Sequence, residues 1–283
     1  MPNTKPKIAV FDIDGTIALN GKVLPEMVQA FTHLQKTGWI TTICTGRGYP
    51  RAKAALGDLF ETIVSPDALL LLEHGTKVNQ LDGTVLYGAY FSEDEINHVH
   101  DFIRSNAEMV RFVWFNPPTQ ERKVQVWCKD ASDISDLEAE RGSYSDVYST
   151  SFGNLRERLH AQPLSSLSIK LMPHIQVHGL KLNFTRTPIK VTFQDGNMDF
   201  TKTNTNKALS IDYFLKHHGG SHERLLVAGN STNDVDMLNM PAAHRILVGD
   251  DAETDTIMGY LYEHESVTRL KNPQALAGYL QTL

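Results

Sequence analysis

Two carboxylates two residues apart, Asp12 and Asp14, follow an apolar run near the N-terminus and precede Gly15. The run, Ile8–Phe11, has the composition of a buried strand in a parallel sheet. Ligands of open α/β sheets bind at the carboxyl ends of such strands, and a glycine lets the chain turn sharply there. One carboxylate could attack a substrate or bind a cation while the other transfers protons. An acidic turn without chemistry is the alternative, but the pair together with Gly15-Thr16 favours function.

A second segment of this kind is Thr45-Gly46-Arg47, which follows the apolar and β-branched run Ile40–Cys44. A hydroxyl at a strand end, beside a glycine that exposes main-chain amides, can hydrogen-bond a phosphate oxygen. Thr-Gly is also a common turn, so the tripeptide alone is a weak signal. Arg47 would either contact a substrate or lie solvated at the surface.

Lys207 is the candidate cation for a bound phosphate. It begins a helical pattern, Lys207–His217, where a lysine is unfavourable for the helix dipole unless an anion occupies the site. It would then neutralise phosphate and restrain a negative aspartate. Lys202 is the competing candidate, but no helical pattern begins there. A solvated lysine without a role is the alternative reading of Lys207.

The fourth segment, Gly229–Leu238, follows the short apolar run Leu225–Ala228 and reads Gly-Asn-Ser-Thr-Asn-Asp-Val-Asp-Met-Leu. In type and order, the four segments resemble the four motifs of the haloacid dehalogenase (HAD) superfamily, most of whose members are Mg-dependent phosphohydrolases. The fourth motif of that family is Gly-Asp-x-x-Asn-Asp-x-x-Met-Leu. The sequence departs from it at Asn230, which stands where the family has a Mg-binding aspartate.

The resemblance implies a role for each of these residues. Asp12 would attack phosphorus and form an aspartyl-phosphate, and Asp14 would protonate the leaving alcohol and then activate water. Mg²⁺ would be bound by Asp12, the Asp14 main-chain carbonyl and Asn230, more weakly than in an aspartate-bearing relative because an amide brings no charge. The expected substrate-binding residues are Thr45, Gly46, Arg47 and Lys207, and Asn233 and Asp234 would support the metal ligands.

Strands and helices that alternate at both ends of the chain must position these segments. This alternation predicts an α/β fold, a Rossmann-like, doubly wound parallel-sheet core. The expected core strands are Lys7–Phe11, Trp39–Cys44, one within Ile63–Leu72, Leu225–Ala228 and Arg245–Val248. The expected core helices are Pro25–Thr37, Tyr49–Leu59, Lys207–His217, Asp234–Leu238 and Pro273–Leu280.

The central part of the chain has a different character, which predicts an inserted α+β cap domain. Asp82-Gly83 with Thr84–Tyr87 predicts a hairpin, and Ser92–Ser105 a helix that begins with a capping box. Val110–Phe115 and Lys123–Cys128 predict antiparallel strands. Further expected cap elements are a helix at Asn154–His160 and strands at Leu167–Met172 and Ile189–Phe193.

We therefore expect three segments: 1–83 for the first part of the core, 84–195 for the cap and 196–283 for the second part of the core. A cap inserted between the second and third motifs resembles HAD subclass IIB, the Cof-type sugar phosphatases. Specificity would then lie in the cap, where the aromatic strand Phe112–Phe115 and the strand Lys123–Trp127 are the first elements to consider.

The composition excludes several functional classes. Of 283 residues, 41% are hydrophobic and 21% charged, and the net charge of −6 argues against binding nucleic acid or an anionic membrane surface. Cys44 and Cys128 form no CxxC pair, which argues against a disulfide framework or a thiolate zinc site and fits a reducing compartment. The sequence shows neither a signal peptide in residues 1–7 nor an apolar stretch of membrane-spanning length. A cytoplasmic protein is expected, and no pattern indicates an oligomeric state.

Two pairs of histidines are alternative candidates for a metal site. His98 and His100 are spaced to point to different faces of a helix, and His217-His218 lies at a helix end where a positive charge suits the dipole. Neither pair has the spacing of a metal site.

The expected function is a Mg-dependent phosphomonoester hydrolase acting on a small sugar phosphate or related phosphorylated metabolite. A phosphomutase is the first alternative, because it shares the Asp-x-Asp-Gly-Thr start. A non-catalytic protein that binds phosphorylated ligands on a HAD scaffold is the second, motivated by Asn230 alone.

Overall fold

The computed structural model describes residues 5–116, 124–130, 134, 147–149, 151–173, 175, 187–194 and 196–283. The chain forms two compact units, which we call the core unit (residues 1–88 and 205–283) and the cap unit (residues 89–204). These boundaries differ by five and nine residues from the expected ones, 83/84 and 195/196. Lys123 and Asp195, where a strand and the end of the cap were expected, lie outside the described residues.

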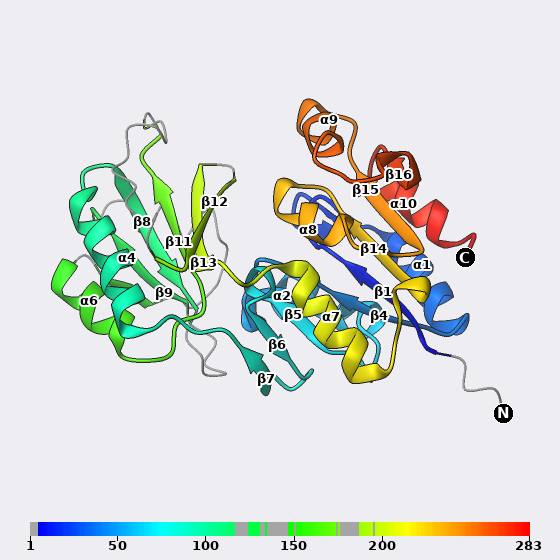
Figure 1. The fold of residues 1–283 in the computed structure, drawn as a ribbon, viewed down its shortest axis with the longest axis horizontal. Coiled ribbons are helices and arrows are strands. Elements are labelled where there is room, and N and C mark those ends of the chain that lie inside the picture. Colours follow the sequence, from blue (N-terminus) through cyan, green and yellow to red (C-terminus); the bar gives the residue numbers. More distant parts are fainter. Residues whose placement is uncertain are drawn as a thin grey trace. The chain divides into compact units, whose positions relative to one another are not determined.

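The core unit is built on a five-stranded parallel sheet, which confirms the predicted α/β class (Figure 1). The strands are β1 (Lys7–Phe11), β4 (Trp39–Ile43), β14 (Leu225–Gly229), β15 (His244–Val248) and β16 (Val267–Leu270). Their order is β16-β15-β14-β1-β4. The chain therefore places its second parallel strand on one side of β1 and its later strands on the other, so the strand order reverses at β1. Such a reversal opens a crevice at the carboxyl ends of the strands.

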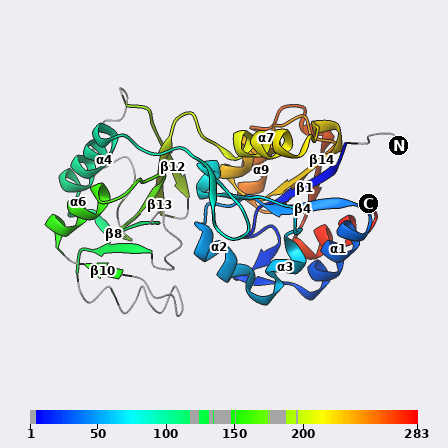
Figure 2. The same ribbon diagram turned by 90° about the horizontal axis from the view of Figure 1, so that it is seen from below.

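Helices cover both faces of this sheet, with α1 and α3 on one face and α7 on the other (Figure 2). The core helices are α1 (Pro25–Lys36), α2 (Tyr49–Leu56), α3 (Phe60–Ile63), α7 (Lys207–His218), α8 (Val235–Leu238), α9 (Ala252–Met258) and α10 (Pro273–Leu280). Sequence patterning missed α9 and β16. The first has only seven residues, and the second is an edge strand of four residues, of which only Val267 is buried.

Two antiparallel elements complete the core unit. β2 (Ala18–Leu19) and β3 (Lys22–Val23) form a hairpin directly after the paired aspartates, and its turn, Asn20-Gly21, has positive φ at both residues. β5 (Leu70–Leu72), β6 (Lys77–Asn79) and β7 (Val85–Gly88) form a three-stranded sheet. The hairpin predicted at Asp82-Gly83 is confirmed and belongs to the core unit.

The cap unit has one six-stranded sheet with helices α4 (Glu93–Ser105) and α6 (Phe152–His160) (Figure 2). The strands are β8 (Val110–Phe115), β9 (Gln125–Cys128), β10 (Val147–Ser149), β11 (Leu167–Leu171), β12 (Ile189–Gln194) and β13 (Asn197–Lys202), in the order β10-β9-β8-β11-β13-β12. The predicted antiparallel pairing of β8 and β9 is confirmed. β13 pairs with β11 and β12, so residues 197–202 belong to the cap sheet and not to the core.

The aromatic strand β8 contributes to both faces of the cap sheet. Val113 and Phe115 are buried in the cluster that includes α4 and α6. Phe112 is buried in a separate cluster with Val126 and Cys128, against which Trp114 packs. The strand residues first considered for specificity are thus mostly buried, with Trp114 the more accessible aromatic side chain.

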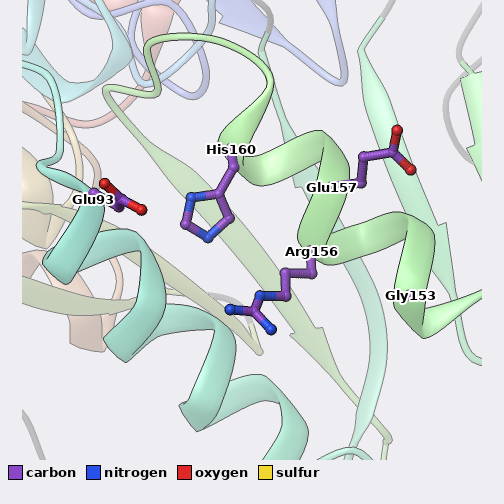
Figure 3. A pocket seen from close by; sticks show the side chains of 5 residues that line it. All are labelled: Glu93, Gly153, Arg156, Glu157 and His160. Atoms are coloured by element: carbon purple, nitrogen blue, oxygen red, sulfur yellow. The ribbon is translucent and has the colours of Figure 1, made fainter.

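A pocket of about 400 Å³ lies in the cap unit, between the first turn of α4 and the length of α6. Glu93 and His160 face it, Arg156 reaches toward the same space and Glu157 points away (Figure 3). None of the candidate site residues lines it. The pocket is open, and both acidic and basic side chains line it. It therefore does not favour a ligand of either charge.

Glu95 ties the start of α4 to β13. Its carboxylate accepts hydrogen bonds from the Ser92 main-chain N–H at 2.5 Å and from Lys202 Nζ at 3.2 Å, and the Ser92 hydroxyl accepts from Glu95 N–H at 3.3 Å. This confirms the predicted capping box. Burial raises the pKa of Glu95, but these hydrogen bonds and the Lys202 charge lower it further than burial raises it.

Replacing Glu95 by Gln is therefore expected to destabilise the cap unit in a pH-dependent way. A lowered pKa in the folded state means that ionised Glu95 stabilises the fold above its ordinary pKa of 4.5 and loses this effect as the pH falls through the lowered value. Urea unfolding of wild type and Glu95→Gln at pH 7 and below pH 4 measures the effect. A destabilisation of equal size at both pH values would contradict it.

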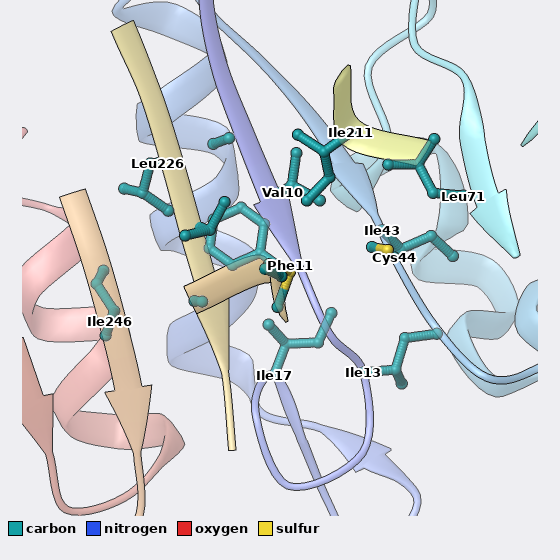
Figure 4. Packing of buried hydrophobic residues seen from close by; sticks show 14 of the residues in the cluster. Val10, Phe11, Ile13, Ile17, Ile43, Cys44, Leu71, Ile211, Leu226 and Ile246 are labelled. Atoms are coloured by element: carbon teal, nitrogen blue, oxygen red, sulfur yellow. The ribbon is translucent and has the colours of Figure 1, made fainter. Parts of the chain in front are cut away.

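The core packing holds the carboxyl ends of the central strands in place (Figure 4). Ile8–Phe11 of β1 are fully buried, and Phe11 packs edge-to-face on Phe31 with ring centroids 4.8 Å apart. Cys44 and Cys128 are buried free thiols. None of the helices in the described residues has both the length and the apolar composition needed to cross a bilayer.

Candidate active site

The candidate residues converge on the carboxyl edge of the core sheet. Asp12 directly follows β1, Asn230 follows β14 and Thr45 comes two residues after β4. The ladder continues past β1, because Asp12 N–H donates to Ala228 O at 2.9 Å and Cys44 N–H to Phe11 O at 2.8 Å. These hydrogen bonds fix the three strand ends side by side, at the point where the strand order reverses.

Lys207 links two carboxylates in the interior of this site. Its Nζ lies 2.6 Å from Asp12 Oδ1 and 2.5 Å from Asp234 Oδ1. Lys207 is 1% exposed and Asp234 is fully buried. Asn206, the N-cap of α7, accepts a hydrogen bond from Leu209 N–H and so places Lys207 in the first turn. The structure thus joins Lys207, and not Lys202, to Asp12.

Burial and neighbouring charges shift the pKa values of this cluster. Burial raises the pKa of Asp12 to about 7, although the Lys207 ammonium opposes the rise. Burial would lower the pKa of Lys207, but Asp12 and Asp234 raise it above its usual value, so Lys207 stays protonated. A further cation near Asp12 would favour its charged, nucleophilic form.

Asp234 also holds the loop that contains Asn230. Its Oδ2 accepts hydrogen bonds from the main-chain N–H groups of Asn230 at 2.9 Å and Ser231 at 3.0 Å. A side chain at Gly229 would put its Cβ 2.5 Å from Asp234 Cγ, so only glycine admits this approach. Asn233 accepts from the Ser231 hydroxyl at 3.0 Å. Asp234 therefore connects the Lys207 charge to the backbone at Asn230.

The Asn230 side chain packs on the first motif. Its Oδ1 accepts a hydrogen bond from the Thr16 hydroxyl at 3.1 Å. Gly15 has φ +80°, and a Cβ there would collide with Asn230 Nδ2. Thr16, which is fully buried, was not among the predicted site residues, although it is part of the motif Asp-x-Asp-Gly-Thr.

Asp14 is paired with Arg47. The guanidinium donates from Nε to Asp14 Oδ2 at 2.8 Å and from NH2 to Oδ1 at 2.9 Å, a bidentate pair. The Asp14 side chain is 53% exposed, in contrast to buried Asp12. The sequence leaves two interpretations of Arg47 open, a substrate contact and a solvated side chain. The structure adds a third: Arg47 orients Asp14, the second carboxylate of the motif.

The loop after β4 brings the Thr45 hydroxyl to the same edge, and its main-chain amides at Thr45 and Arg47 hold the loop in place. Thr45 N–H donates to Leu71 O at 2.9 Å, and Arg47 N–H donates to the Thr45 hydroxyl oxygen at 3.2 Å. The Thr45 side chain is buried. The ring of His74 lies against Gly46. His74 was not among the predicted site residues, and its only signal in the sequence was its place two residues after the strand that ends at Leu72.

The residues that lie together include few charged metal ligands. Within the described part of the chain, no group of three or more His, Cys, Asp or Glu side chains is placed to hold a metal ion. Asn230, which follows β14, contributes an uncharged side-chain amide at this edge. Two of the carboxylates at this edge already have cationic partners, Asp14 in Arg47 and Asp234 in Lys207.

Comparison with solved structures identifies the same fold in several proteins of low sequence identity. A HAD/COF-like hydrolase from Plasmodium vivax aligns with a TM-score of 0.78 and 21% identity, over 99% of this chain and 96% of that one. A HAD superfamily phosphatase from Bacteroides thetaiotaomicron aligns with a TM-score of 0.73 and 16% identity, over 99% and 96%. A HAD subclass IIB sugar phosphatase aligns with a TM-score of 0.72 and 16% identity, over 98% and 97%.

None of the curated proteins compared with this sequence matches it significantly. Residues 9–250 match the family profile of haloacid dehalogenase-like hydrolases, which spans all four motif segments. The chain belongs to the haloacid dehalogenase-like hydrolase family.

Proposed function

We propose that this protein is a Mg-dependent phosphatase that hydrolyses small phosphomonoesters through an aspartyl-phosphate on Asp12. The observation that carries the proposal is the buried contact of Lys207 with Asp12 and Asp234 at the carboxyl edge of the core sheet. A nucleophilic carboxylate, a fixed cation and the proposed phosphate-binding groups Thr45 and Gly46 would then act within one site. A sugar phosphate is the favoured substrate class, since the fold is shared with a subclass IIB sugar phosphatase.

Two steps transfer the phosphoryl group. Asp12 attacks phosphorus and forms a P–O bond, while the bond to the leaving alcohol breaks and Asp14 gives that alcohol its proton. Asp14, now a carboxylate, then takes a proton from water, whose oxygen attacks phosphorus and releases phosphate and free Asp12. Arg47 holds both oxygens of Asp14 in the structure, so this pair must open or shift for Asp14 to act.

Positioning and charge supply most of the catalysis. An ammonium has three N–H donors, and the two carboxylate contacts of Lys207 leave one for a phosphoryl oxygen. The Thr45 hydroxyl and the Gly46 amide would hold the other oxygens. The fixed contacts of Lys207 with Asp12 and Asp234 support this proposal, because electrostatic stabilisation is strongest where the charged groups are held before the substrate binds.

The donor atoms suit a hard cation held with modest affinity. The Asp12 carboxylate, the Asp14 main-chain carbonyl and Asn230 Oδ1 would hold Mg²⁺, which prefers such oxygen ligands. When bound, Mg²⁺ would neutralise charge on the transferring phosphoryl group and on Asp12. Asn230 Oδ1 already accepts a hydrogen bond from Thr16, and this bond orients the amide oxygen.

Replacing Asn230 by Asp is expected to lower the Mg²⁺ concentration for half-maximal phosphate release by about tenfold, or ~1.4 kcal/mol of binding energy. The two side chains have nearly the same shape, and the substitution adds a negative charge beside the proposed cation. Mg²⁺ titrations of activity, together with calorimetric binding of Mg²⁺, measure the change. An unchanged or weaker Mg²⁺ affinity in both assays would count against Asn230 as a ligand.

A substrate panel tests the function itself. Phosphate release from sugar phosphates and from an aryl phosphate is expected at high Mg²⁺ concentration. Isomerised product without phosphate release would indicate a phosphomutase instead. Binding of sugar phosphates without any turnover, in wild type and Asn230→Asp, would indicate a non-catalytic binding protein.

We also propose that the protein works in the cytoplasm on a soluble phosphorylated metabolite. Both cysteines are buried free thiols, as suits a reducing compartment. Immunofluorescence or fractionation of the native host tests this location. A disulfide-bonded or exported form of the protein would contradict it.

A further inference from the structure

We infer that His74 contacts the phosphoryl group of the substrate beside Gly46 and is an additional substrate-binding residue. The inference rests on the proposed function of the same site. No motif that we considered in the sequence includes this histidine, and it comes from the end of a strand that contributes no other candidate residue.

The backbone places His74 at the edge that carries the other candidates. Cys44 and Leu71 form a parallel bridge, so the chain leaving β5 runs beside the chain leaving β4. His74 N–H donates to Thr45 O at 3.1 Å, and Glu73 N–H donates to Arg47 O at 3.2 Å. Two main-chain hydrogen bonds therefore join this segment directly to the proposed phosphate-binding loop.

The imidazole occupies the space where residue 46 would carry a side chain. A Cβ built on Gly46 would lie 2.5 Å from His74 Cε1, 2.7 Å from Nε2 and 3.1 Å from Nδ1. The edge of the ring that holds both nitrogens thus lies against Gly46. Gly46 does not have a positive φ, so the His74 ring, and not backbone strain, is what excludes a side chain there.

The segment is held in an unusual conformation. Glu73 and His74 have φ values of +52° and +59°, which residues other than glycine rarely adopt. A buried ion pair of Glu73 with Lys77 at 3.0 Å anchors the segment on one side. On the other, Gly75 packs so closely on the Asn206 carbonyl that a Cβ would collide with it. Such backbone outliers concentrate at functional sites.

His74 thereby connects the two phosphate-binding parts of the site. Its ring lies on Gly46, and the glycine after it packs against the residue that caps α7 at Lys207. Arg47 and Lys207 direct their charges to carboxylates. An imidazole N–H is a hydrogen-bond donor, and an oxygen of a phosphoryl group bound at Gly46 would be a suitable acceptor for it.

Phosphate binding by His74→Asn and His74→Gly variants tests the inference. Asn and Gly both tolerate the left-handed backbone, so these variants should keep the fold. We expect each to weaken the affinity for inorganic phosphate, measured by calorimetry with MgCl₂ present, by about tenfold, equal to ~1.4 kcal/mol. KM for an aryl phosphate should rise more than kcat falls. His33→Asn, in the last turn of α1, is the matched control and should change neither quantity.

A spectroscopic readout separates this inference from the proposed function. In nitrogen-detected NMR spectra of the wild type, the imidazole resonances of His74 are those that are missing from the spectrum of His74→Asn. Inorganic phosphate should shift these resonances but not the resonances of His33. If wild type releases phosphate while the His74 variants keep wild-type phosphate affinity and KM, His74 is not a binding residue and the function stands. If wild type neither binds nor releases phosphate, both proposals fail.

A double-mutant cycle gives a second, independent check on the contact. Gly46→Ala should weaken phosphate binding, because the new Cβ displaces the His74 ring. In a His74→Gly background the same substitution should reduce the affinity for phosphate several-fold less. If Gly46→Ala reduces the affinity for phosphate equally in the two backgrounds, the His74 ring on Gly46 plays no part in phosphate binding.

Discussion

Asp12→Asn is expected to lower kcat for phosphate release by about 10⁴-fold or more, because an amide is a far poorer nucleophile than a carboxylate. Asp12 is buried at the end of β1, and its neighbour Lys207 keeps a second partner in Asp234. The variant should therefore fold with the Lys207 charge still paired. Phosphate release from an aryl phosphate at saturating Mg²⁺ measures the loss.

The matched control for this experiment is Asp58→Asn, which changes an exposed aspartate in the 3₁₀ turn after α2. It should keep wild-type kcat and KM. Asp14→Asn should act differently from Asp12→Asn: it removes the proton donor but leaves the nucleophile, so an aryl phosphate with a good leaving group should still phosphorylate the protein. Wild-type rates in Asp12→Asn would refute the mechanism.

Lys207→Met should have the second largest effect, on both stability and activity. The substitution keeps the length of the side chain but leaves Asp12 and Asp234 as adjacent buried carboxylates without a cation. Removing one partner of a buried ion pair costs about 3–5 kcal/mol of the free energy of unfolding. Phosphate release should fall as well, because the Lys207 contact to the transferring group is lost.

Unfolding of the core unit can be followed selectively. Trp39 is the one tryptophan of the core segments, so a Trp114→Phe, Trp127→Phe background reports core unfolding in urea through Trp39 fluorescence. Lys202→Met is the matched control, since Lys202 belongs to the cap unit and contacts Glu95 instead. It should leave core stability and kcat unchanged. Equal core destabilisation by both variants would contradict the role of Lys207.

The fold of the core could be predicted from the sequence where a hydrophobic pattern ends at a residue that can do chemistry. Apolar runs that end in Asp12, Thr45 and Asn230 predict parallel strands, and parallel strands bring their carboxyl ends to one edge. The helical pattern that starts at Lys207 distinguished it from Lys202, which lies in a strand paired within the cap sheet. These inferences need only the period of hydrophobic residues and the type of residue at each strand end.

Other features depend on tertiary contacts that no local pattern contains. The bidentate pair of Asp14 with Arg47 joins residues 33 positions apart, and its geometry follows from the side-chain directions of two loops. The left-handed backbone at His74 is imposed by the Glu73–Lys77 ion pair and by packing at Gly75. β13 (Asn197–Lys202) escaped prediction because it begins just after the expected domain boundary at 195/196, in a segment that was expected to belong to the core.

The most direct test of the proposed chemistry is peptide mass mapping of Asp14→Asn after a brief reaction with an aryl phosphate and Mg²⁺, quenched in acid. Asp14 would otherwise activate the water that removes the phosphoryl group, so the intermediate should accumulate in this variant. The mechanism predicts one added phosphoryl group on the peptide that contains Asp12, removable by hydroxylamine. A protein that releases phosphate yet carries the phosphoryl group on another peptide, or on none, would contradict it.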